Sequence, residues 1–281
     1  MKFISIETGV NKKSTKLDLD KYYTPYDVME HSVNTTIQVL NDLGKEVTQY
    51  LEPSAGSGVF SKYIKSLGLD ILSMDISPDF EDCIQQDFLT YPTNYIKGRC
   101  IIGNPPFGAR LNLAQKFYKK SIELGDYISF ILPISQLNNT RTMYEFDLVY
   151  SEDLGKVKFS DSKLIHCCLN IYVRNPKGLN SKPISKLKDI TIIRQDSPKY
   201  AHSSYDVRMC CWGASIGKLL QEGESYSSEY KIQIHNTNLK DKVIEVLRNV
   251  DWFNELNFTG VPKLQQFHII QLLQKHIKEI K

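Results

Sequence analysis

Strand-like apolar runs alternate with amphipathic helical patterns along the first half of the chain, and this alternation limits the possible folds most strongly. VTQYLE, DILSMDIS, GRCIIG and DYISFILP read as strands that start at residues 47, 70, 98 and 126. Helical patterns precede, separate or follow them, as in LNLAQKFYKKSIELG from residue 111. Such alternation predicts an α/β fold with a mostly parallel twisted sheet and helices on both faces. Ligands of such sheets bind beyond the carboxyl ends of the strands.

Composition is that of an ordinary soluble protein, with 41% hydrophobic and 24% charged residues among 281. No apolar run approaches the ~18 residues that would span a bilayer. The first 20 residues hold no apolar stretch long enough for a signal peptide, so we expect a cytoplasmic protein without a membrane partner. The six cysteines form no C-x-x-C pair and no H-E-x-x-H is present, so we expect reduced thiols and no metal.

A loop at 175–183, NPKGLNSKP, predicts a boundary between a catalytic domain at 1–180 and a small α+β extension at 181–281. DVRMCCWG and SEYKIQIHN in the extension read as strands, and NLKDKVIEVLRNV and PKLQQFHIIQLLQKHIKEIK read as amphipathic helices. The extension holds 15 basic and 11 acidic residues, whereas the preceding part holds 20 and 21. Its modest positive excess fits a nucleic-acid or target-recognition module, and a solvated surface would account for it nearly as well.

Turns after successive strands carry the residue types that an adenosyl ligand needs. In LEPSAGSG, Gly56 and Gly58 let a backbone approach a ligand closely, although a plain tight turn would also use them. Asp75 ends the next strand, 19 residues after Gly56, where a carboxylate commonly holds ribose hydroxyls. Asp87 follows a third expected strand and can accept a hydrogen bond from an adenine amine while Phe88 flanks the ring.

A further buried run, RCIIG, ends in Asn104, Pro105, Pro106 and Phe107. The two prolines exclude helix and remove two backbone donors, so an amide and an aromatic ring should lie beyond the strand end. Upstream, TPYDVMEHSVNTTIQVLNDLG reads as a helix that Thr24 can cap, with Pro25 as its first residue.

The segments YYTPYDV, LEPSAGSG, MDIS, QDFL and NPPF follow one another in the order seen in S-adenosylmethionine-dependent amino methyltransferases. Over roughly residues 20–175 the chain most resembles the gamma group of adenine-specific DNA methyltransferases. The resemblance implies a Rossmann-like class I methyltransferase fold. It also implies S-adenosylmethionine as methyl donor, no metal, and methyl transfer to the N6 amine of an adenine flipped out of DNA.

The resemblance also implies roles for individual residues. The methionine end of the cofactor would be bordered by Tyr23, Thr24 and Pro25, and its methionine and ribose wall would be formed by Glu52, Ser54, Ala55 and Gly56. Asp75 would hold the ribose hydroxyls with Ile76 against the adenine, and Asp87 and Phe88 would read that adenine. The target base would be held by Asn104, Pro105, Pro106 and Phe107.

The NPPF turn does not identify the molecule that carries the amine, since RNA bases and glutamine amides offer a planar nitrogen too. The T-P segment before the Gly-rich turn, the basic extension and basic residues around NPPF favour double-stranded DNA; the last group comprises Lys97, Arg99, Arg110, Lys116, Lys119 and Lys120. RNA-base methylation, protein glutamine methylation and an inactive methyltransferase-fold binding module remain alternatives. The sequence leaves open the recognition site, the oligomeric state and any restriction partner.

Overall fold

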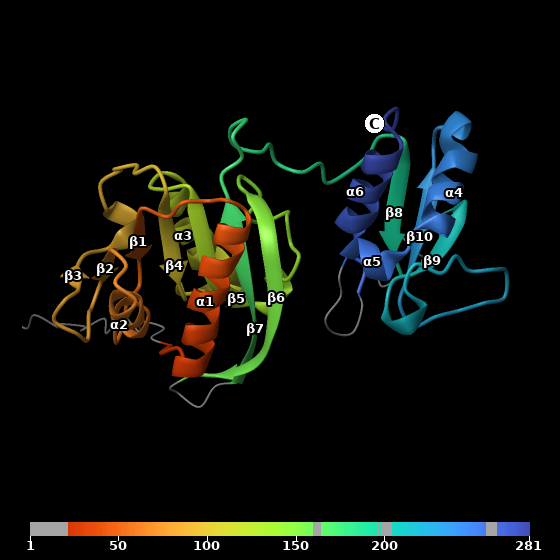
Figure 1. Cartoon of the computed structure of the whole chain (residues 1–281). Helices are drawn as coiled ribbons and strands as arrows, with labels where there is room; N and C mark the ends of the chain where they lie inside the picture. The colour runs from red at the N-terminus through yellow and green to blue at the C-terminus, as the bar shows by residue number, and fades with distance from the viewer. Residues whose placement is uncertain (1–21, 160–163, 196, 198–203, 257–262) are drawn as a thin grey trace, which may run out of the picture.

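The computed structural model describes residues 22–159, 164–195, 197, 204–256 and 263–281, which form two sheets with their own helices (Figure 1). Strands of the first sheet are β1 (Gln49–Glu52), β2 (Ile71–Asp75), β3 (Ile84–Gln85), β4 (Arg99–Gly103), β5 (Tyr127–Pro133), β6 (Asp147–Lys158) and β7 (Leu164–Val173). Its helices are α1 (Tyr26–Asp42), α2 (Val59–Ser66) and α3 (Asn112–Ile122). The second sheet has strands β8 (Ile190–Arg194), β9 (Val207–Cys210) and β10 (Glu229–Ile234), and it is accompanied by helices α4 (Lys240–Asn249), α5 (Trp252–Leu256) and α6 (Gln266–His276).

The first sheet has the strand order β3-β2-β1-β4-β5-β7-β6. Strands β1 to β5 pair in parallel, and β7 lies antiparallel between β5 and β6. The parallel part has the order of a doubly wound Rossmann sheet. With the antiparallel β7 inserted before β6, the sheet has the Rossmann-like class I methyltransferase arrangement. The predicted fold class is therefore confirmed.

Helices cover both faces of this sheet, and β4 shows how its sequence requires this. Successive strand side chains point to opposite faces. Cys100 and Ile102 pack in the apolar cluster that includes α1 and α2, whereas Ile101 packs in the cluster that includes α3. A strand that is apolar on both sides must be covered on both sides, which explains the uninterrupted run before NPPF.

The start of α1 differs from the prediction. Pro25 occupies the N-cap position, and no side chain caps the helix. Thr24 is buried, and its hydroxyl oxygen accepts a hydrogen bond from the side-chain amide of Asn104 at 3.2 Å. The prediction that Thr24 caps α1 was wrong, because its oxygen faces the NPPF turn.

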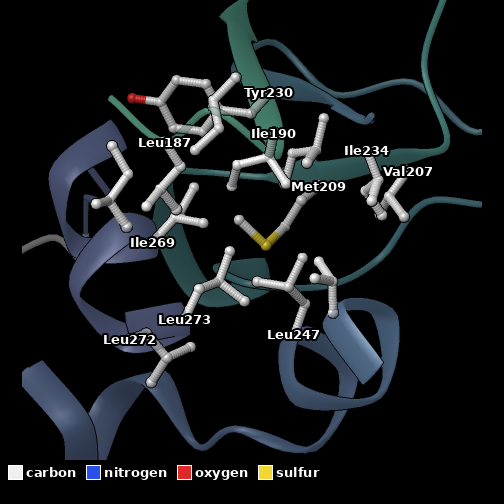
Figure 2. Close-up of a cluster of buried hydrophobic side chains, with 14 of the residues drawn as sticks. Leu187, Ile190, Val207, Met209, Tyr230, Ile234, Leu247, Ile269, Leu272 and Leu273 are labelled. Carbon is white, nitrogen blue, oxygen red and sulfur yellow. The ribbon is translucent and has the colours of Figure 1, made fainter. Parts of the chain in front are cut away.

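The second sheet has a hydrophobic core of its own, drawn from residues 187 to 280. Figure 2 shows Met209 at its centre, among side chains from the three strands and from α4 and α6. The predictions of β9, β10, α4 and α6 are confirmed. Strand β8 was not predicted, because Ile193 interrupts the apolar–polar alternation of its five residues.

The two units touch through the loop after β5. The Asn138 side-chain amide donates to the backbone carbonyl of Leu256 at 3.0 Å, and that of Gln271 donates to the Thr140 hydroxyl at 3.0 Å. Residues 138 and 140 follow the carboxyl end of β5. The second unit therefore contacts the first at the loop that runs from the end of β5 to the start of β6, where the Asn138 backbone amide also donates to the Ser151 hydroxyl of β6 at 2.9 Å.

We expect Gly217→Ala to destabilise the second unit strongly. Gly217 has a φ of +80°, and an added Cβ would lie 1.9 Å from Cδ1 of the buried Trp252. Left-handed strain and overpacking together should cost about 3 kcal/mol or more in urea-induced unfolding. Gly213→Ala is the matched control, since Gly213 has a φ of +73° and no atom within 4 Å of its added Cβ. It should cost only about 1 kcal/mol; equal losses in the two variants would contradict the packing account.

Candidate functional site

The turns after β1, β2 and β4 lie together because these strands are parallel neighbours. The Gly56 amide donates to the Asp75 carboxylate at 2.8 Å, which joins the turn after β1 to the end of β2. The Ser54 hydroxyl donates to the backbone carbonyl of Asn104 at 3.2 Å, which joins the same turn to the end of β4. The structure thus brings together the Gly-rich turn, Asp75 and the NPPF turn, as the sequence predicts.

The side chain of Asn104 is fixed by its nitrogen and leaves its oxygen unused. Nδ2 donates to Thr24 Oγ1 at 3.2 Å and to the Tyr22 carbonyl at 3.4 Å. Oδ1 is buried and has no hydrogen-bond partner in the part of the chain that the structure describes. A buried amide oxygen without a donor is costly, so this atom gains most from a ligand that brings an N–H group.

The rest of the NPPF turn forms a stiff support beside Asn104. Pro105 is buried, while Pro106 and Phe107 are half-buried. The Phe107 ring packs against the apolar cluster under α1 and α2, and its carbonyl accepts from the Ala114 amide at 3.4 Å. One part of the ring is therefore held by the protein, and the remainder stays accessible.

Two residues just beyond this turn have a backbone conformation that the sequence did not reveal. Arg110 has a φ of 53° and Leu111 a φ of 63°, in the left-handed region that residues other than glycine rarely adopt. Consecutive residues of this kind are costly and concentrate at functional sites. No sequence signal marks them, since glycine and asparagine are the usual residues there.

Aromatic rings of the protein itself lie against both glycines of the turn after β1. A Cβ on Gly56 would lie 3.3 Å from the Tyr23 ring, and a Cβ on Gly58 would lie 2.7 Å from the Phe80 ring. The Tyr23 hydroxyl also donates to Asp79. Residue 23 thus lies at the predicted place, beside the Gly-rich turn, and the glycines are needed for this close packing whatever else binds there.

Glu52 lies at the end of β1, but its carboxylate points toward α2. It is buried and accepts hydrogen bonds from the Ser61 amide at 3.1 Å and from the Ser61 hydroxyl, which also contacts Ser73. Burial raises the pKa of Glu52 to about 8, although the bonds from Ser61 oppose the rise. A neutral carboxyl group at pH 7 is the consequence.

The other predicted cofactor-binding residues differ in their solvent exposure. Asp75 is 9% exposed, and it also accepts from the Ser77 amide at 2.8 Å. Ile76 is 48% exposed, which leaves an apolar surface next to it. Ala55 is buried, and its amide donates to the Met74 carbonyl at 3.0 Å.

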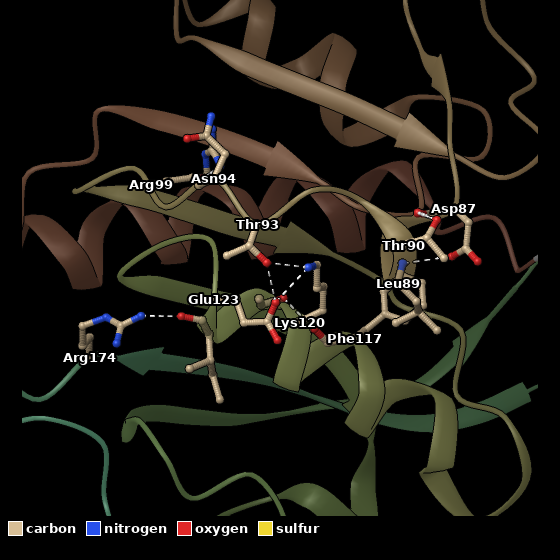
Figure 3. A network of polar contacts seen from close by, with 12 residues as sticks. Asp87, Leu89, Thr90, Thr93, Asn94, Arg99, Phe117, Lys120, Glu123 and Arg174 are labelled. Atoms are coloured by element: carbon tan, nitrogen blue, oxygen red, sulfur yellow. Dashed lines mark hydrogen bonds and ion pairs between the residues drawn. The ribbon is translucent and has the colours of Figure 1, made fainter.

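Asp87 and Phe88 lie at the short 3-10 turn after β3. Figure 3 shows the Asp87 side chain at this turn, near Leu89 and Thr90. One Asp87 oxygen caps this turn by accepting from the Leu89 amide at 2.9 Å. The Phe88 ring is 1% exposed and packs on Phe117, with 5.0 Å between ring centroids. Phe88 therefore belongs to the core under α3, and only the Asp87 carboxylate of this pair borders the surface.

The basic residues near NPPF in the sequence do not gather around it in space. Lys97 and Arg99 lie at the start of β4, at the opposite edge of the sheet, where the Arg99 guanidinium bonds to Gln49 and to the Asn94 carbonyl. Lys119 pairs with Glu145, and Lys120 pairs with Glu123 at 2.8 Å. The prediction of a basic surface flanking the turn is wrong for these four residues, and it holds at most for Arg110 and Lys116.

The residues at this edge fit S-adenosylmethionine. A carboxylate has about four lone-pair sites, so Asp75 can accept from ribose hydroxyls while keeping its two backbone bonds. Ile76 offers apolar surface to an adenine, and the Asp87 carboxylate lies after the next strand. Among the described residues, no group of three or more His, Cys, Asp or Glu side chains is placed to hold a metal ion. None of the described helices is long and apolar enough to cross a membrane.

Comparison with known proteins finds similar solved structures. No family model matches the chain, and no curated protein matches it. A Pyrococcus horikoshii protein assigned as an RNA methyltransferase, PH1948, has 18% identity and a TM-score of 0.45 over 58% of this chain and 90% of its own. The 23S rRNA methyltransferase ErmE has 12% identity and a TM-score of 0.42 over 57% of this chain and 72% of its own.

A third structure, the Synechocystis magnesium protoporphyrin IX methyltransferase ChlM with bound S-adenosylmethionine, has 9% identity and a TM-score of 0.39. It covers 53% of this chain and 80% of its own. Because all three TM-scores are below 0.5, the fold assignment depends on the strand order and not on these similarities.

We expect Glu52→Gln to remove a pH dependence of stability. The carboxyl group has a pKa near its usual 4.5 when unfolded and about 8 when folded, so its protonated form favours the folded state. Its stabilising contribution is complete below pH 4.5 and is lost as the pH rises to about 8. The pKa difference sets an upper bound of about 5 kcal/mol on this loss in the free energy of unfolding.

Urea-induced unfolding of both proteins at pH 5 and pH 9 measures this effect. The variant should gain stability over the native protein at pH 9 and show little difference at pH 5. Glu81→Gln, an exposed position of the same domain, is the control. Parallel pH profiles for the native protein and Glu52→Gln would contradict the assignment of a neutral Glu52.

Proposed function

We propose that this protein transfers a methyl group from S-adenosylmethionine to the exocyclic N6 amine of an adenine flipped out of double-stranded DNA. The observation that carries the proposal is the buried Oδ1 of Asn104, which has no partner among the described residues. Asn104 lies at the carboxyl edge of a Rossmann-like sheet, and its backbone carbonyl accepts a hydrogen bond from Ser54 in the same Gly-rich turn that Asp75 holds. The Asn104 Oδ1 atom is a buried acceptor without a partner among the described residues, so it can accept a hydrogen bond from a planar amine of the substrate.

The proposed chemistry depends on how the amine is held. The lone pair of an aromatic amine is delocalised into its ring, so the nitrogen is a poor nucleophile. Two acceptors, Asn104 Oδ1 and the Pro105 carbonyl, would bind the two amine hydrogens and favour a pyramidal nitrogen with its lone pair freed. The cofactor, when bound, supplies the methyl group from its sulfonium centre.

The bonds from Asn104 Nδ2 to the 22–24 segment give this arrangement its rigidity. They hold the amide plane in one orientation, so that Oδ1 and not Nδ2 is presented to the substrate. Because the reaction depends on alignment of the reacting atoms, free rotation of the Asn104 amide would lower the reaction rate considerably. Thr24 is therefore a positioning residue for Asn104, in addition to the cofactor contact that the resemblance implies for it.

The target base would stack on the accessible part of the Phe107 ring, a contact worth ~1–3 kcal/mol. A base inside a duplex cannot reach this edge, so it has to be rotated out of the helix. Asp75 would hold the ribose of the cofactor and Asp87 its adenine. The second unit, with its own core and its contact with the loop after β5, would serve as the nucleic-acid-binding module.

The direct test is to express the protein and to map methylated bases in the host's DNA and RNA by sequencing. Methylated adenine in DNA that depends on the protein is the expected result. Methylation confined to RNA would replace DNA by RNA as the substrate, and methylation of a protein glutamine alone would exclude both nucleic acids. S-adenosylmethionine binding without transfer to any of them would indicate a binding module.

We expect Asn104→Ala to lower methyl transfer at least a hundredfold while S-adenosylmethionine still binds. The substitution removes an acceptor that acts only on the target amine, and mispositioned amines react far more slowly. Radioactive methyl transfer and calorimetry measure the two properties separately. Asn34→Ala, an exposed asparagine of α1 that binds Tyr63, is the matched control and should keep full activity. Turnover at the native rate in Asn104→Ala would exclude the proposed mechanism.

We expect Asp75→Ala to weaken S-adenosylmethionine binding about tenfold or more, since hydrogen bonds to a charged group are worth about 1.5–3 kcal/mol. Isothermal titration calorimetry gives the affinity, and a thermal melt reports the added loss of the bond from Gly56. Asp82→Ala, an exposed aspartate that pairs with Lys65, controls for the change in charge. An affinity equal to that of the native protein would reject the role of Asp75.

A further inference from the structure

An exposed indole on the second unit has no role in the site described above. Trp212 lies two residues after the end of β9 and is 48% exposed, whereas the other tryptophan of the chain, Trp252, is 3% exposed. Tryptophan buries more apolar surface than any other side chain, so leaving half of it in water forgoes substantial stabilisation. Exposed tryptophans of this kind are frequent centres of binding sites.

The indole stands on a rigid support. Residue 212 forms an isolated antiparallel bridge with Lys263, and the Leu264 amide donates to the Cys211 carbonyl at 2.9 Å. Cys211 and Leu264 are buried in the core of the second unit. The backbone on both sides of Trp212 is therefore fixed, and a ligand that stacks on the ring loses little entropy to ordering of the protein.

The ammonium group of Lys263 lies beside the Trp212 ring. The Lys263 ammonium lies 5.6 Å from the centroid of the Trp212 ring. Lys263 is exposed and forms no ion pair with a described carboxylate. Five other cations of this unit are paired with carboxylates, in Arg208–Glu229, Lys218–Glu224, Lys240–Asp206, Lys242–Glu279 and Lys275–Glu255.

The environment of the neighbouring thiol agrees with a positive local field. Burial raises the pKa of Cys211, and the charges of Arg194 and Lys263 both oppose that rise. An aromatic face beside an unpaired ammonium matches a nucleotide, whose base stacks while its phosphate accepts from the cation. An apolar peptide would use the ring but would leave the ammonium without a partner.

The segment that supports Trp212 leads into the helix that contacts the first unit. Leu264, bonded to residue 211, is two residues before α6. Gln271, five residues into that helix, binds Thr140 in the loop after β5.

We propose that Trp212 and Lys263 form a stacking site for one nucleotide of the target strand. The inference rests on the proposed function, because it assumes a nucleic-acid substrate. The Trp212 ring would stack on the π-face of any base, and the Lys263 ammonium would bind one phosphate. The site would therefore increase the affinity for the strand and fix its direction without sequence specificity.

The two tryptophans allow a direct optical test. In Trp252→Phe the only indole is Trp212, and this change removes no hydrogen bond, since Trp252 Nε1 has no partner among the described residues. Titration with single-stranded oligothymidylate of about 12 nucleotides should quench its fluorescence to saturation. In Trp212→Phe the remaining indole is buried, and the same titration should leave its fluorescence unchanged.

Binding of the same oligonucleotide to full-length protein, followed by filter retention, tests the site in the native background. Trp212→Ala should weaken binding about 5- to 150-fold, which corresponds to ~1–3 kcal/mol, and Trp212→Phe should recover most of it. Lys263→Gln should reduce the slope of log affinity against log salt by about one. Tyr95→Ala, an exposed aromatic of the first unit, is the control.

The outcomes separate the two proposals. Two results would overturn the stacking site and leave the proposed function intact. One is an oligonucleotide affinity of Trp212→Ala equal to that of the native protein. The other is unquenched Trp212 fluorescence in a Trp252→Phe protein that binds the oligonucleotide. A native protein that binds S-adenosylmethionine but neither single-stranded nor duplex DNA nor RNA overturns both. Failure of Asn104→Ala to lose activity bears only on the catalytic proposal.

Discussion

The hydrogen bonds from the Asn104 amide to the segment before α1 are the contact on which the site depends most. They fasten Tyr22 and Thr24, which precede the first helix, to the turn that follows β4. One amide thereby sets where α1 begins, keeps the 22–24 segment over the Gly-rich turn, and leaves its own oxygen unpaired. Stability and function compete at this atom, because satisfying Oδ1 within the protein would remove the acceptor that a substrate needs.

The turns after the parallel strands combine hydrogen-bonded polar groups with two buried amide oxygens, of Asn104 and Gln136, that have no partner among the described residues. The Gly56–Asp75 and Ser54–Asn104 bonds join three turns from three parallel strands, and the carboxyl group of Glu52 is held by Ser61 below them. Such bonds make the edge rigid before any ligand arrives. A rigid edge suits a reaction in which a nitrogen, a methyl carbon and a sulfur must lie in line.

The second unit adds a different kind of surface. Its core closes around Met209 without help from the first sheet (Figure 2), and it reaches that sheet through contacts at the loop after β5. Five of its fifteen basic side chains form ion pairs among the described residues, and its basic residues outnumber its acidic ones by 15 to 11. Recognition by this unit would then combine a modest positive charge with local features such as Trp212 and Lys263.

The sequence by itself determined the order of strands and helices, the fold class, and which turns hold the candidate residues, because parallel strands with regular helical connections must end at one edge. Only the tertiary structure decided where single side chains point. Thr24 was expected as a helix cap and instead receives the Asn104 amide. The ring of Phe88 is buried on Phe117, and Arg99, five residues before Asn104, lies at the opposite edge. Propensity and spacing describe neighbours along the chain, whereas hydrogen-bond partners come from distant segments, 80 residues apart for Thr24 and Asn104 and 131 apart for Thr140 and Gln271.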